Sequence, residues 1–262
     1  MKTRLDAELV RRGLARSRDN AIDLIDSGQV LVNGIPASKA ASQVDAQISI
    51  TLKDDHDEFV SRGGHKLAGA LDHFSNFSVE GKVALDAGAS TGGFTDVLLK
   101  RGVQKVIAVD VGYGQLAWSL QSNERVKILD RVNVRTLTKE IVGESVDLIV
   151  ADLSFISLKL VLPALISVAK DGADFLVMVK PQFEVGREKL GAGGVVRDPA
   201  LRRAAVLDVA ESAYDVGLGT MGIAASPLPG PAGNVEYFLW LRRGAPAIDE
   251  AALDTAIAMG PA

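Results

Sequence analysis

Short apolar segments of strand length alternate with helical segments from residue 82 onward, and this alternation constrains the fold more than any other feature of the chain. The predicted strands cover Val83–Asp86, Val106–Asp110, Val126–Leu129, Val146–Asp152, Phe175–Lys180, Met221–Ala225 and Val235–Leu241. The predicted helices cover Gly93–Arg101, Leu116–Gln121, Leu158–Val168 and Pro199–Val216. Nearly continuous apolar strands separated by helices are typical of a parallel sheet covered on both faces. We therefore predict an α/β fold with a Rossmann-like, mostly parallel, seven-stranded sheet.

Ionisable residues stand at the ends of five of these strands in succession: Asp86, Asp110, Asp130, Asp152 and Lys180. Parallel strands bring their carboxyl ends to one edge of the sheet, and ligands of such sheets bind beyond that edge. The sequence therefore predicts a binding site rich in carboxylates at this edge.

The loop after the first strand, Asp86-Ala-Gly-Ala-Ser-Thr-Gly-Gly-Phe-Thr95, contains glycines that permit tight turning and a close approach of the backbone to a ligand. Its spacing differs from the Gly-x-Gly-x-x-Gly of dinucleotide enzymes and from the phosphate-binding P-loop. Asp110, which ends the next strand, can accept hydrogen bonds from ribose hydroxyls. An excess of carboxylates suits a cofactor with a positive centre and no phosphates, such as S-adenosylmethionine, whereas NAD would be repelled. A strand-to-helix turn without a ligand is the alternative for the loop taken alone.

Composition excludes several classes of protein and of site. The chain of 262 residues has no cysteine, which excludes disulfides, zinc–cysteine sites, iron–sulfur clusters and a cysteine nucleophile. The three histidines, His56, His65 and His73, are too few and too close in sequence for a catalytic triad together with a metal site, so we expect no metal. The longest apolar runs have strand length, and the first residues lack the apolar core of a signal peptide. We expect a soluble, cytoplasmic protein with no membrane partner.

Residues 1–58 are predicted to form a small α+β domain. Apolar residues on one face indicate a helix over residues 4–13, and Ser17 is a candidate N-cap for a second helix that ends at Gly28. Asn33-Gly34 between apolar residues is a strong β-hairpin signal, because both positions of the turn need a positive φ. A further strand is expected over residues 46–52.

Basic residues concentrate in this small domain, although the whole chain has a net charge of −4. Residues 1–42 contain seven Lys/Arg and five Asp/Glu, so the remainder of the chain is more acidic than the total indicates. Arginines at helix ends can present planar donors to phosphates, although a solvated helical face would have the same composition. The order of residues in Arg4-Leu-Asp, Gly13-Leu-Ala-Arg-Ser-Arg18 and Val30-Leu-Val-Asn-Gly34 resembles the S4 RNA-binding domain. That resemblance implies contacts with structured RNA through Arg4, Arg11, Arg12, Arg16 and Arg18.

The stretch after this domain, residues 54–58, is acidic and lacks periodicity, which indicates a solvated connector. A helix is expected over Gly64–Phe74, with Leu67 and Leu71 facing inward and Lys66 on its first turn. The predicted organisation is an S4-like domain over 1–58, a linker and first helix over 59–81, a Rossmann-like domain over 82–244, and a C-terminal helix and tail over 245–262.

Longer motifs in the larger domain resemble those of the TlyA family, the haemolysin-A-like ribosomal RNA 2′-O-methyltransferases. They are the glycine loop from Asp86 to Thr95, Asp110-Val-Gly-Tyr-Gly-Gln-Leu116, Asp152-Leu-Ser-Phe-Ile-Ser157, Val179-Lys-Pro-Gln-Phe-Glu-Val-Gly186, Gly193-Gly-Val-Val-Arg-Asp-Pro199 and Ser226-Pro-Leu-Pro-Gly-Pro-Ala-Gly-Asn-Val-Glu-Tyr-Phe238. The resemblance covers nearly the whole chain and implies an S4 head on an FtsJ-like, S-adenosylmethionine-dependent methyltransferase domain. It also implies a cytidine of ribosomal RNA as the substrate, in the large ribosomal subunit and with the small subunit as a second candidate.

Related 2′-O-methyltransferases use a Lys–Asp–Lys–Glu tetrad, and the resemblance assigns it to Lys66, Asp152, Lys180 and Glu236. A ribose hydroxyl is a poor nucleophile and must lose its proton as the new bond forms. Lys180 is the candidate base, which must be neutral when it acts, while Asp152 and Glu236 would orient the lysines and the hydroxyl. A surface salt bridge is the alternative for each residue alone, and the position of Lys66 depends on how its helix packs.

The resemblance and the glycine loop together indicate the candidate cofactor-binding residues: Asp86, Gly88, Ser90, Gly92, Phe94, Asp110, Asp130 and Asn133. Asp86 has a second interpretation, the ordering of the glycine loop, and Phe94 has one as a core residue. Asn133 matches a family asparagine near the adenine edge. Asp130 stands in Asp130-Arg-Val, which departs from the more usual Glu-x-Thr of the family.

Three alternatives to this enzyme stay open at the level of sequence. A methyltransferase fold without catalysis could serve as an RNA-binding or ribosome-assembly protein, but such a protein needs no acid–base tetrad. A membrane-active haemolysin is disfavoured because no segment has membrane length. A base N-methyltransferase commonly has an Asp/Asn-Pro-Pro-aromatic loop, where this chain has Asp152-Leu-Ser-Phe155. The sequence leaves the oligomeric state open.

Overall fold

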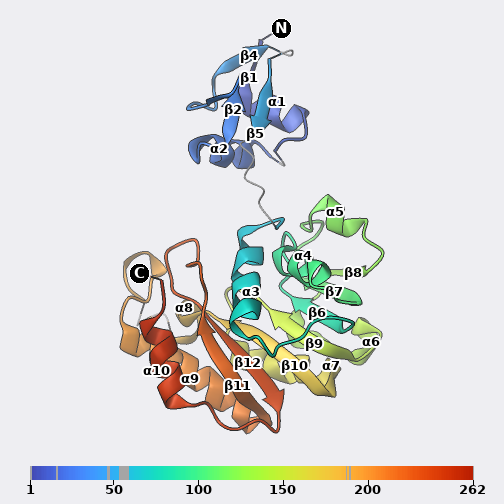
Figure 1. Cartoon of the computed structure of the whole chain (residues 1–262), viewed down its shortest axis with the longest axis vertical. Helices are drawn as coiled ribbons and strands as arrows, with labels where there is room; N and C mark the ends of the chain where they lie inside the picture. Colours follow the sequence, from blue (N-terminus) through green and yellow to red (C-terminus); the bar gives the residue numbers. More distant parts are fainter. Residues whose placement is uncertain are drawn as a thin grey trace. The chain divides into compact units, whose positions relative to one another are not determined.

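The chain divides into two compact units, Met1–Glu58 and Phe59–Ala262 (Figure 1). The computed structural model describes residues 2–15, 17–45, 48–52, 59–186, 188 and 190–261. Arg16, His56 and the acidic stretch 54–58 lie outside the described residues, as do the first two residues of the strand expected over 46–52. In the part of the chain that is described, no helix has both the length and the apolar character needed to cross a membrane.

The first unit packs two helices against short antiparallel strands. The helices are α1 (Leu5–Arg11) and α2 (Arg18–Asp26). The strands are β1 (Lys2–Arg4), β2 (Val30–Val32), β3 (Ile35–Pro36), β4 (Gln43–Asp45) and β5 (Ile50–Leu52), paired as β1-β4 and β3-β2-β5. A small core of its own, which includes Leu5, Leu9, Ala21, Ile25 and Val30, holds these elements together.

Local signals in this unit act as the sequence predicts. The Ser17 side chain accepts a hydrogen bond from the backbone N–H of Asn20 and so caps α2. Asn33 and Gly34 both have a positive φ, 51° and 78°, and form the turn between β2 and β3. Strands β1 and β4 were not predicted, because each is too short to show alternation and neither adjoins a turn signal such as the Asn33-Gly34 that follows β2.

The second unit is built on a seven-stranded sheet in the order β11-β12-β10-β9-β6-β7-β8. Its strands are β6 (Val83–Ala87), β7 (Lys105–Asp110), β8 (Val126–Asp130), β9 (Val146–Ala151), β10 (Ala169–Val179), β11 (Leu218–Ala225) and β12 (Tyr237–Arg243). Strands β6 to β10 pair in parallel, whereas β12 lies antiparallel between β10 and β11. The predicted mostly parallel α/β sheet is confirmed.

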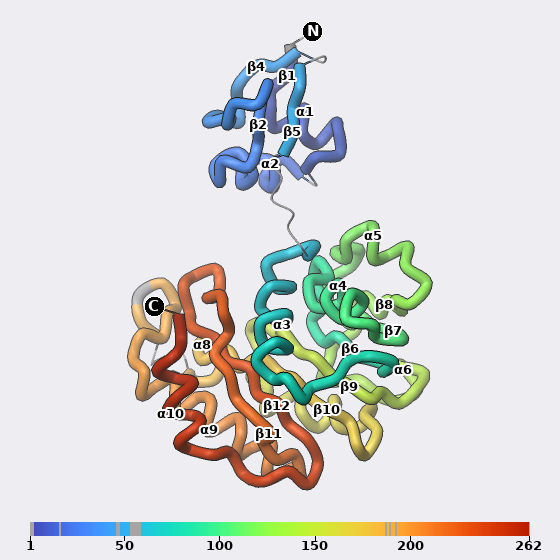
Figure 2. The backbone as a smooth tube through the Cα atoms, in the orientation of Figure 1, coloured from blue at the N-terminus to red at the C-terminus, as the bar shows by residue number. Residues whose placement is uncertain are grey.

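Helices cover both faces of this sheet (Figure 2). On one face lie α3 (Arg62–His73), α4 (Gly93–Lys100) and α5 (Trp118–Gln121), which pack on strand residues such as Ala84, Val106, Leu148, Leu176 and Phe238. On the other lie α6 (Lys139–Val142), α7 (Leu162–Val168), α9 (Pro199–Asp215) and α10 (Glu250–Ala258), which pack on residues such as Leu85, Ile107, Ile149, Val177 and Leu239. Neighbouring strand residues thus pack on opposite faces of the sheet, so the central parts of the strands are apolar on both faces.

Short helical turns complete the connections: η1 (Val134–Thr136), η2 (Leu158–Leu160), α8 (Pro181–Glu184) and η4 (Ala192–Gly194). The prediction of a single helix over Leu158–Val168 is therefore wrong in one respect. The segment forms two helices, η2 and α7, with Pro163 in the first turn of α7. Proline has no N–H for a preceding turn, so it starts a helix more readily than it continues one.

Candidate functional site

Glycines bring α3 to the carboxyl edge of the sheet. A Cβ atom on Gly93 of α4 would lie 2.3 Å from Ser61 Oγ and 2.7 Å from the backbone N of Gly64, so only glycine permits this approach of the two helices. A Cβ on Gly63 would lie 3.9 Å from Asp152 Oδ2. Gly93 therefore lets the start of α3 lie close to α4, and Gly63 in the first turn of α3 lies beside Asp152, which follows β9.

One lysine–carboxylate pair forms where two neighbouring parallel strands end. Asp152 follows β9 and Lys180 follows β10, and Lys180 Nζ lies 2.5 Å from Asp152 Oδ1. Lys180 Nζ also donates a hydrogen bond of 3.1 Å to Ser154 Oγ. The pair is partly open, since the side chains are 11% and 23% exposed.

A second pair joins parts of the chain that are far apart in sequence. Lys66 Nζ of α3 lies 2.6 Å from Glu236 Oε2, and these side chains are only 8% and 1% exposed. Glu236 immediately precedes β12, which runs antiparallel to β10, so the start of β12 meets the edge at which β10 ends. A Cβ on Gly230 would lie 2.7 Å from Glu236 Oε1, so a glycine there leaves room for the carboxylate. All four residues of the predicted tetrad thus lie at one edge.

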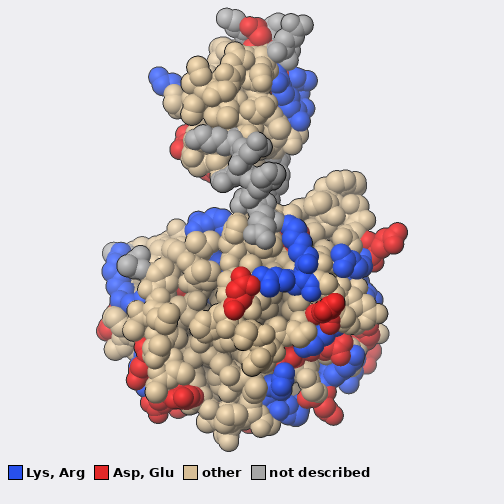
Figure 3. Space-filling view, viewed as in Figure 1, with Lys and Arg blue, Asp and Glu red and all other residues tan. Residues whose placement is uncertain are grey.

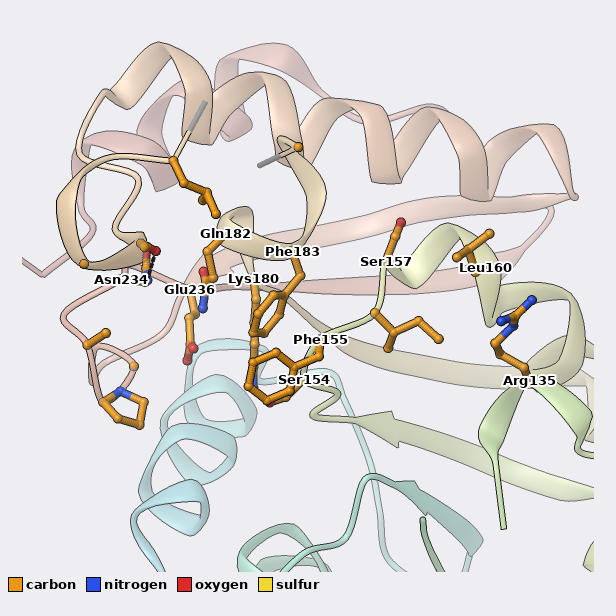
Figure 4. Close-up of a pocket in the computed structure, with 18 residues that line it drawn as sticks. Arg135, Ser154, Phe155, Ser157, Leu160, Lys180, Gln182, Phe183, Asn234 and Glu236 are labelled. Carbon is orange, nitrogen blue, oxygen red and sulfur yellow. Dashed lines mark hydrogen bonds between the residues drawn. The ribbon is translucent and has the colours of Figure 1, made fainter. Parts of the chain in front are cut away.

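Two adjoining cavities open at this edge. A cavity of about 920 Å³ is lined by Lys180 and Glu236 together with residues of α8 and of the loops around it. A smaller one of about 400 Å³ lies over the glycine loop. Ser154, Phe155 and Ile156 line both. Figure 4 shows the larger cavity, with Lys180, Gln182, Phe183, Asn234 and Glu236 among its lining residues. The Lys180–Asp152 pair therefore spans from one cavity to the next.

Phe155 stands at the border between the cavities in an unusual state. Its φ is +64°, which is rare for a bulky residue, and its side chain is 91% exposed. Its ring lies 5.1 Å from that of Phe183, at 47°. Strained and exposed aromatic residues concentrate where a ligand contacts them. Phe155 and Phe183 were not among the predicted site residues, although they stand in the motifs Asp152-Leu-Ser-Phe-Ile-Ser157 and Val179-Lys-Pro-Gln-Phe-Glu-Val-Gly186.

Five of the residues predicted for cofactor or catalysis line the smaller cavity: Gly88, Ser90, Asp110, Asn133 and Asp152. Asp110 organises the loop around it, because its carboxylate accepts hydrogen bonds from the backbone N–H groups of Ser90, at 2.8 Å, and Gly112, at 2.7 Å. Asp130 accepts one from Gly114 N at 2.9 Å and is not part of the wall. Asp130 therefore supports the neighbouring loop.

Two other predicted residues pack beneath this cavity instead of facing it. Phe94 is buried and stacks on Phe238, with ring centroids 6.1 Å apart. Gly92 has a φ of +96°, and a Cβ there would lie 2.2 Å from Leu120 Cδ1. The core interpretation of Phe94 describes its position in the structure.

Asp86 lies under the glycine loop without access to solvent. One carboxylate oxygen accepts a hydrogen bond of 2.7 Å from Thr95 Oγ1, and the other has no partner among the described residues. Burial, to which the nearby charge of Asp152 adds, raises the pKa of Asp86 to about 7. Its bond to Thr95 ties the end of β6 to the start of α4, which orders the loop.

The smaller cavity fits S-adenosylmethionine in charge and size. Its wall presents the carboxylates of Asp110 and Asp152 and the amide of Asn133, and no lysine or arginine is among the described residues that line it. Such a wall favours a cation and repels phosphates. A volume of about 400 Å³ is within the range of small-molecule sites.

The described residues, in this cavity and outside it, contain no group of three or more His, Asp or Glu that could hold a metal ion.

In the first unit, the described members of the predicted RNA-binding set, Arg4, Arg11, Arg12 and Arg18, pair with two acidic residues of α1. Arg4 lies 2.8 Å from Asp6, and Arg11 and Arg12 lie 2.6 and 2.7 Å from Glu8. Hydrogen bonds from these two arginines lower the pKa of Glu8 to about 2. Figure 3 shows basic side chains, in blue, at the surface of this unit.

Arg12 differs from the other arginines of this cluster. Its Nη1 donates a hydrogen bond of 2.8 Å to the carbonyl oxygen of Ile48, and its side chain is 20% exposed. Arg4, Arg11 and Arg18 are much more exposed. Arg12 therefore stabilises the unit, whereas the other three have free surface.

Comparison with known proteins identifies both units. Residues 59–243 match the model of the FtsJ-like methyltransferase family, and residues 3–47 match that of the S4 domain. The chain is 58% identical to the 16S/23S rRNA (cytidine-2′-O)-methyltransferase TlyA of Mycobacterium tuberculosis, over 92% of this chain and 90% of the relative. It is 37% identical to hemolysin A of Brachyspira hyodysenteriae, over 89% and 97%. A solved hemolysin-type structure from Streptococcus thermophilus aligns with a TM-score of 0.78 and 37% identity, over 98% of this chain and 94% of that one.

Proposed function

Because this chain belongs to the TlyA family of FtsJ-like methyltransferases, we propose that it transfers a methyl group from S-adenosylmethionine to the ribose 2′-hydroxyl of a cytidine in ribosomal RNA. The observation that carries this proposal is the Lys180–Asp152 pair, which stands between a cavity suited to a cationic cofactor and a larger cavity open to a nucleotide. A pure RNA-binding protein has no need of such a pair between two cavities.

The cofactor is held, in this proposal, by the residues around the smaller cavity. When bound, S-adenosylmethionine supplies a methyl group on a positively charged sulfur. Gly88 allows the loop to pass close to β9, because a Cβ there would lie 2.5 Å from the carbonyl oxygen of Asp152. Asp110 and Asn133 offer acceptors for hydroxyl and amino groups, and Asp152 contributes negative charge on the side of the larger cavity.

Lys180 is the proposed base. Lys180 lines the cavity in which the ribose would lie, and as the neutral amine its Nζ would take up the proton of the 2′-hydroxyl. The hydroxyl oxygen would bond to the methyl carbon as the bond from that carbon to sulfur breaks, and the sulfur would leave as the neutral thioether. Asp152 and Ser154 hold that Nζ in place. Glu236 lines the same cavity and orients the hydroxyl, while Lys66 holds Glu236 through their buried pair. Lys66 thus acts by positioning Glu236.

The nucleotide needs room and a surface to pack against. A base in an RNA helix cannot bring its ribose into a pocket, so the target nucleotide leaves its stack. The exposed ring of Phe155 offers such a base a flat apolar face beside Lys180. The arginines of the S4 domain add a second contact with phosphates, and two joined contacts increase the affinity for a structured RNA or a ribosomal subunit. Such a substrate is found in the cytoplasm.

The test is methyl transfer from labelled S-adenosylmethionine to purified, unmethylated ribosomal subunits, with the modified atom identified by nuclease digestion. We expect label on a cytidine 2′-oxygen with the wild type and none with Lys180→Ala, while both proteins bind the cofactor. Label on a base would replace this function by base methylation. No label on any subunit, although the cofactor binds, would leave an RNA-binding protein as the better account.

A further inference from the structure

Two amide side chains line the larger cavity and differ in their partners. Asn234 is fully engaged, since its Oδ1 accepts a hydrogen bond of 2.9 Å from Val196 N and its Nδ2 donates one of 3.1 Å to Gly194 O. Gln182 Oε1, in contrast, is shielded from solvent and has no hydrogen-bond partner among the described residues. Asn234 thus holds the loop that contains η4, whereas the amide of Gln182 has no comparable role in the fold.

An unpaired buried amide oxygen is unusual in a folded protein. Most buried polar atoms have a partner, and an exception in a binding cavity is often satisfied by the ligand. The last torsion of a glutamine side chain is soft, so the amide can turn either its oxygen or its nitrogen toward the cavity. A turn about that torsion would therefore bring an acceptor and a donor of Gln182 to the cavity.

Gln182 lines the same cavity as the proposed base, Lys180. It stands in α8, two residues after Lys180 and directly before Phe183. Figure 4 shows its side chain beside those of Lys180 and Glu236. A nucleotide whose 2′-hydroxyl lies at Lys180 has its base in this same cavity, because the base is attached to the neighbouring ribose carbon.

We propose that Gln182 recognises the target base by hydrogen bonds to its pairing edge. The inference rests on the proposed function, and it adds the group by which the enzyme selects the base. Cytosine has an exocyclic amine, a donor, next to ring nitrogen N3, an acceptor. The amide oxygen of Gln182 accepts from the amine, and its NH₂ group donates to N3. Two parallel hydrogen bonds of this kind fix the orientation of the base and, with the amide in this sense, favour cytosine over uracil, whose pairing edge reverses the donor and the acceptor.

The test is a cycle of two proteins and two substrates. The proteins are the wild type and Gln182→Met, which keeps a similar length without polar atoms. The substrates are ribosomal subunits assembled on RNA that carries, at the target position, either cytidine or the same nucleoside without its exocyclic amine. Methyl transfer is measured under single-turnover conditions, and cofactor binding is measured separately for each protein.

For the wild type, we expect loss of the amine to slow methylation by about 5- to 150-fold, because the amide oxygen is then left unpaired. Gln182→Met should methylate the cytidine substrate more slowly by a similar factor and should no longer distinguish the two substrates. Cofactor binding should stay unchanged, since Gln182 does not line the smaller cavity. Gln182→Glu retains an acceptor and should keep part of the preference.

Asn234→Leu is the matched control, because it removes an amide with a structural role from the same wall. It should slow both substrates equally. If Gln182→Met also slows both substrates equally, or if the wild type does not distinguish them, the inference is overturned. If the wild type methylates no 2′-oxygen in either substrate, the proposed function fails, and this inference fails with it.

Discussion

The two lysine–carboxylate pairs at the sheet edge look alike in chemistry and differ in their surroundings. Lys180–Asp152 joins the ends of adjacent parallel strands and lines both cavities. Lys66–Glu236 joins α3 to the start of β12, meets only the larger cavity, through Glu236, and is almost closed to solvent. A lysine side chain that borders a cavity can take up a proton from a ligand when its amine is neutral. A closed pair mainly fixes the position of its members, and leaving one member alone in the interior is costly. We therefore assign proton transfer to the Lys180–Asp152 pair and the positioning of Glu236 to the Lys66–Glu236 pair.

Replacing Lys180 by alanine should have the largest effect. We expect single-turnover methyl transfer to fall by roughly 10²- to 10⁴-fold, the usual contribution of a general base, with little change in stability. Lys170→Ala is the matched control, because Lys170 stands near the other end of β10 and pairs with Asp147 at the surface, at 2.7 Å. Lys170→Ala should transfer methyl groups at the wild-type rate. A Lys180→Ala protein that is nearly as active as wild type would place the base elsewhere.

Replacing Lys66 by methionine tests the closed pair. Removal of one member leaves the Glu236 carboxylate buried without a counter-charge, so we expect the free energy of unfolding of the second unit to fall by about 3–5 kcal/mol. The double variant Lys66→Met/Glu236→Leu should recover much of this stability but not the activity. The measurement is urea unfolding of the full chain, followed by circular dichroism. Equal stability of the single variant and the wild type would show that the pair is open to water.

The pH dependence of stability tests the environment of Asp86, whose pKa is raised in part by the charge of Asp152 in the Lys180–Asp152 pair. Its pKa is raised to about 7, so between about pH 4 and pH 7 the folded protein retains a proton that the unfolded chain releases. The free energy of unfolding therefore falls as the pH rises through this window, by at most about 4 kcal/mol from this group. Asp86→Asn, which stays neutral, should flatten the curve and be more stable than wild type at pH 8.

The control for that prediction is Asp152→Asn. Removing the charge of Asp152 takes away one of the causes that raise the pKa of Asp86, so the loss of stability should shift to lower pH. Melting temperatures measured from pH 4 to pH 8 compare the three proteins. If wild type and Asp86→Asn give parallel curves, Asp86 is ionised in the folded protein throughout this range.

The charged residues at the carboxyl edge of the sheet could be predicted from the sequence, because each of these strands is a short apolar run that ends in a charged residue. Asp86, Asp110, Asp152 and Lys180 need only the parallel order of their strands to come together. The pairing of Lys66 with Glu236 could not be derived in this way, since it depends on how α3 packs. The resemblance to a known family assigned both residues to one tetrad but did not indicate that they pair.

Phe155 and Gln182 were missed for a different reason. The positive φ of Phe155 is imposed by the surrounding loop, and no local preference of phenylalanine predicts it. Gln182 is distinguished by an amide oxygen that has no hydrogen-bond partner in the described part of the chain, and a sequence does not show which atoms are left unpaired. The signal available was their place in the motifs around Asp152 and Lys180. Partners in three dimensions decide which motif residues serve the fold and which remain available to a ligand.

The smallest effects are expected in the S4 domain, where the same contrast between open and engaged groups recurs. Arg11 and Arg12 both pair with Glu8, but Arg11 is 60% exposed and Arg12 is 20% exposed with a hydrogen bond to Ile48 O. Arg11→Ala should weaken binding to ribosomal subunits a few-fold and lower the slope of log affinity against log salt by about one, because one phosphate contact is lost. Arg12→Ala should instead destabilise the domain by about 1 kcal/mol and leave the slope unchanged. Subunit binding measured over a range of salt concentrations distinguishes the two, and an equal change of slope in both variants would mean that Arg12 also contacts the RNA.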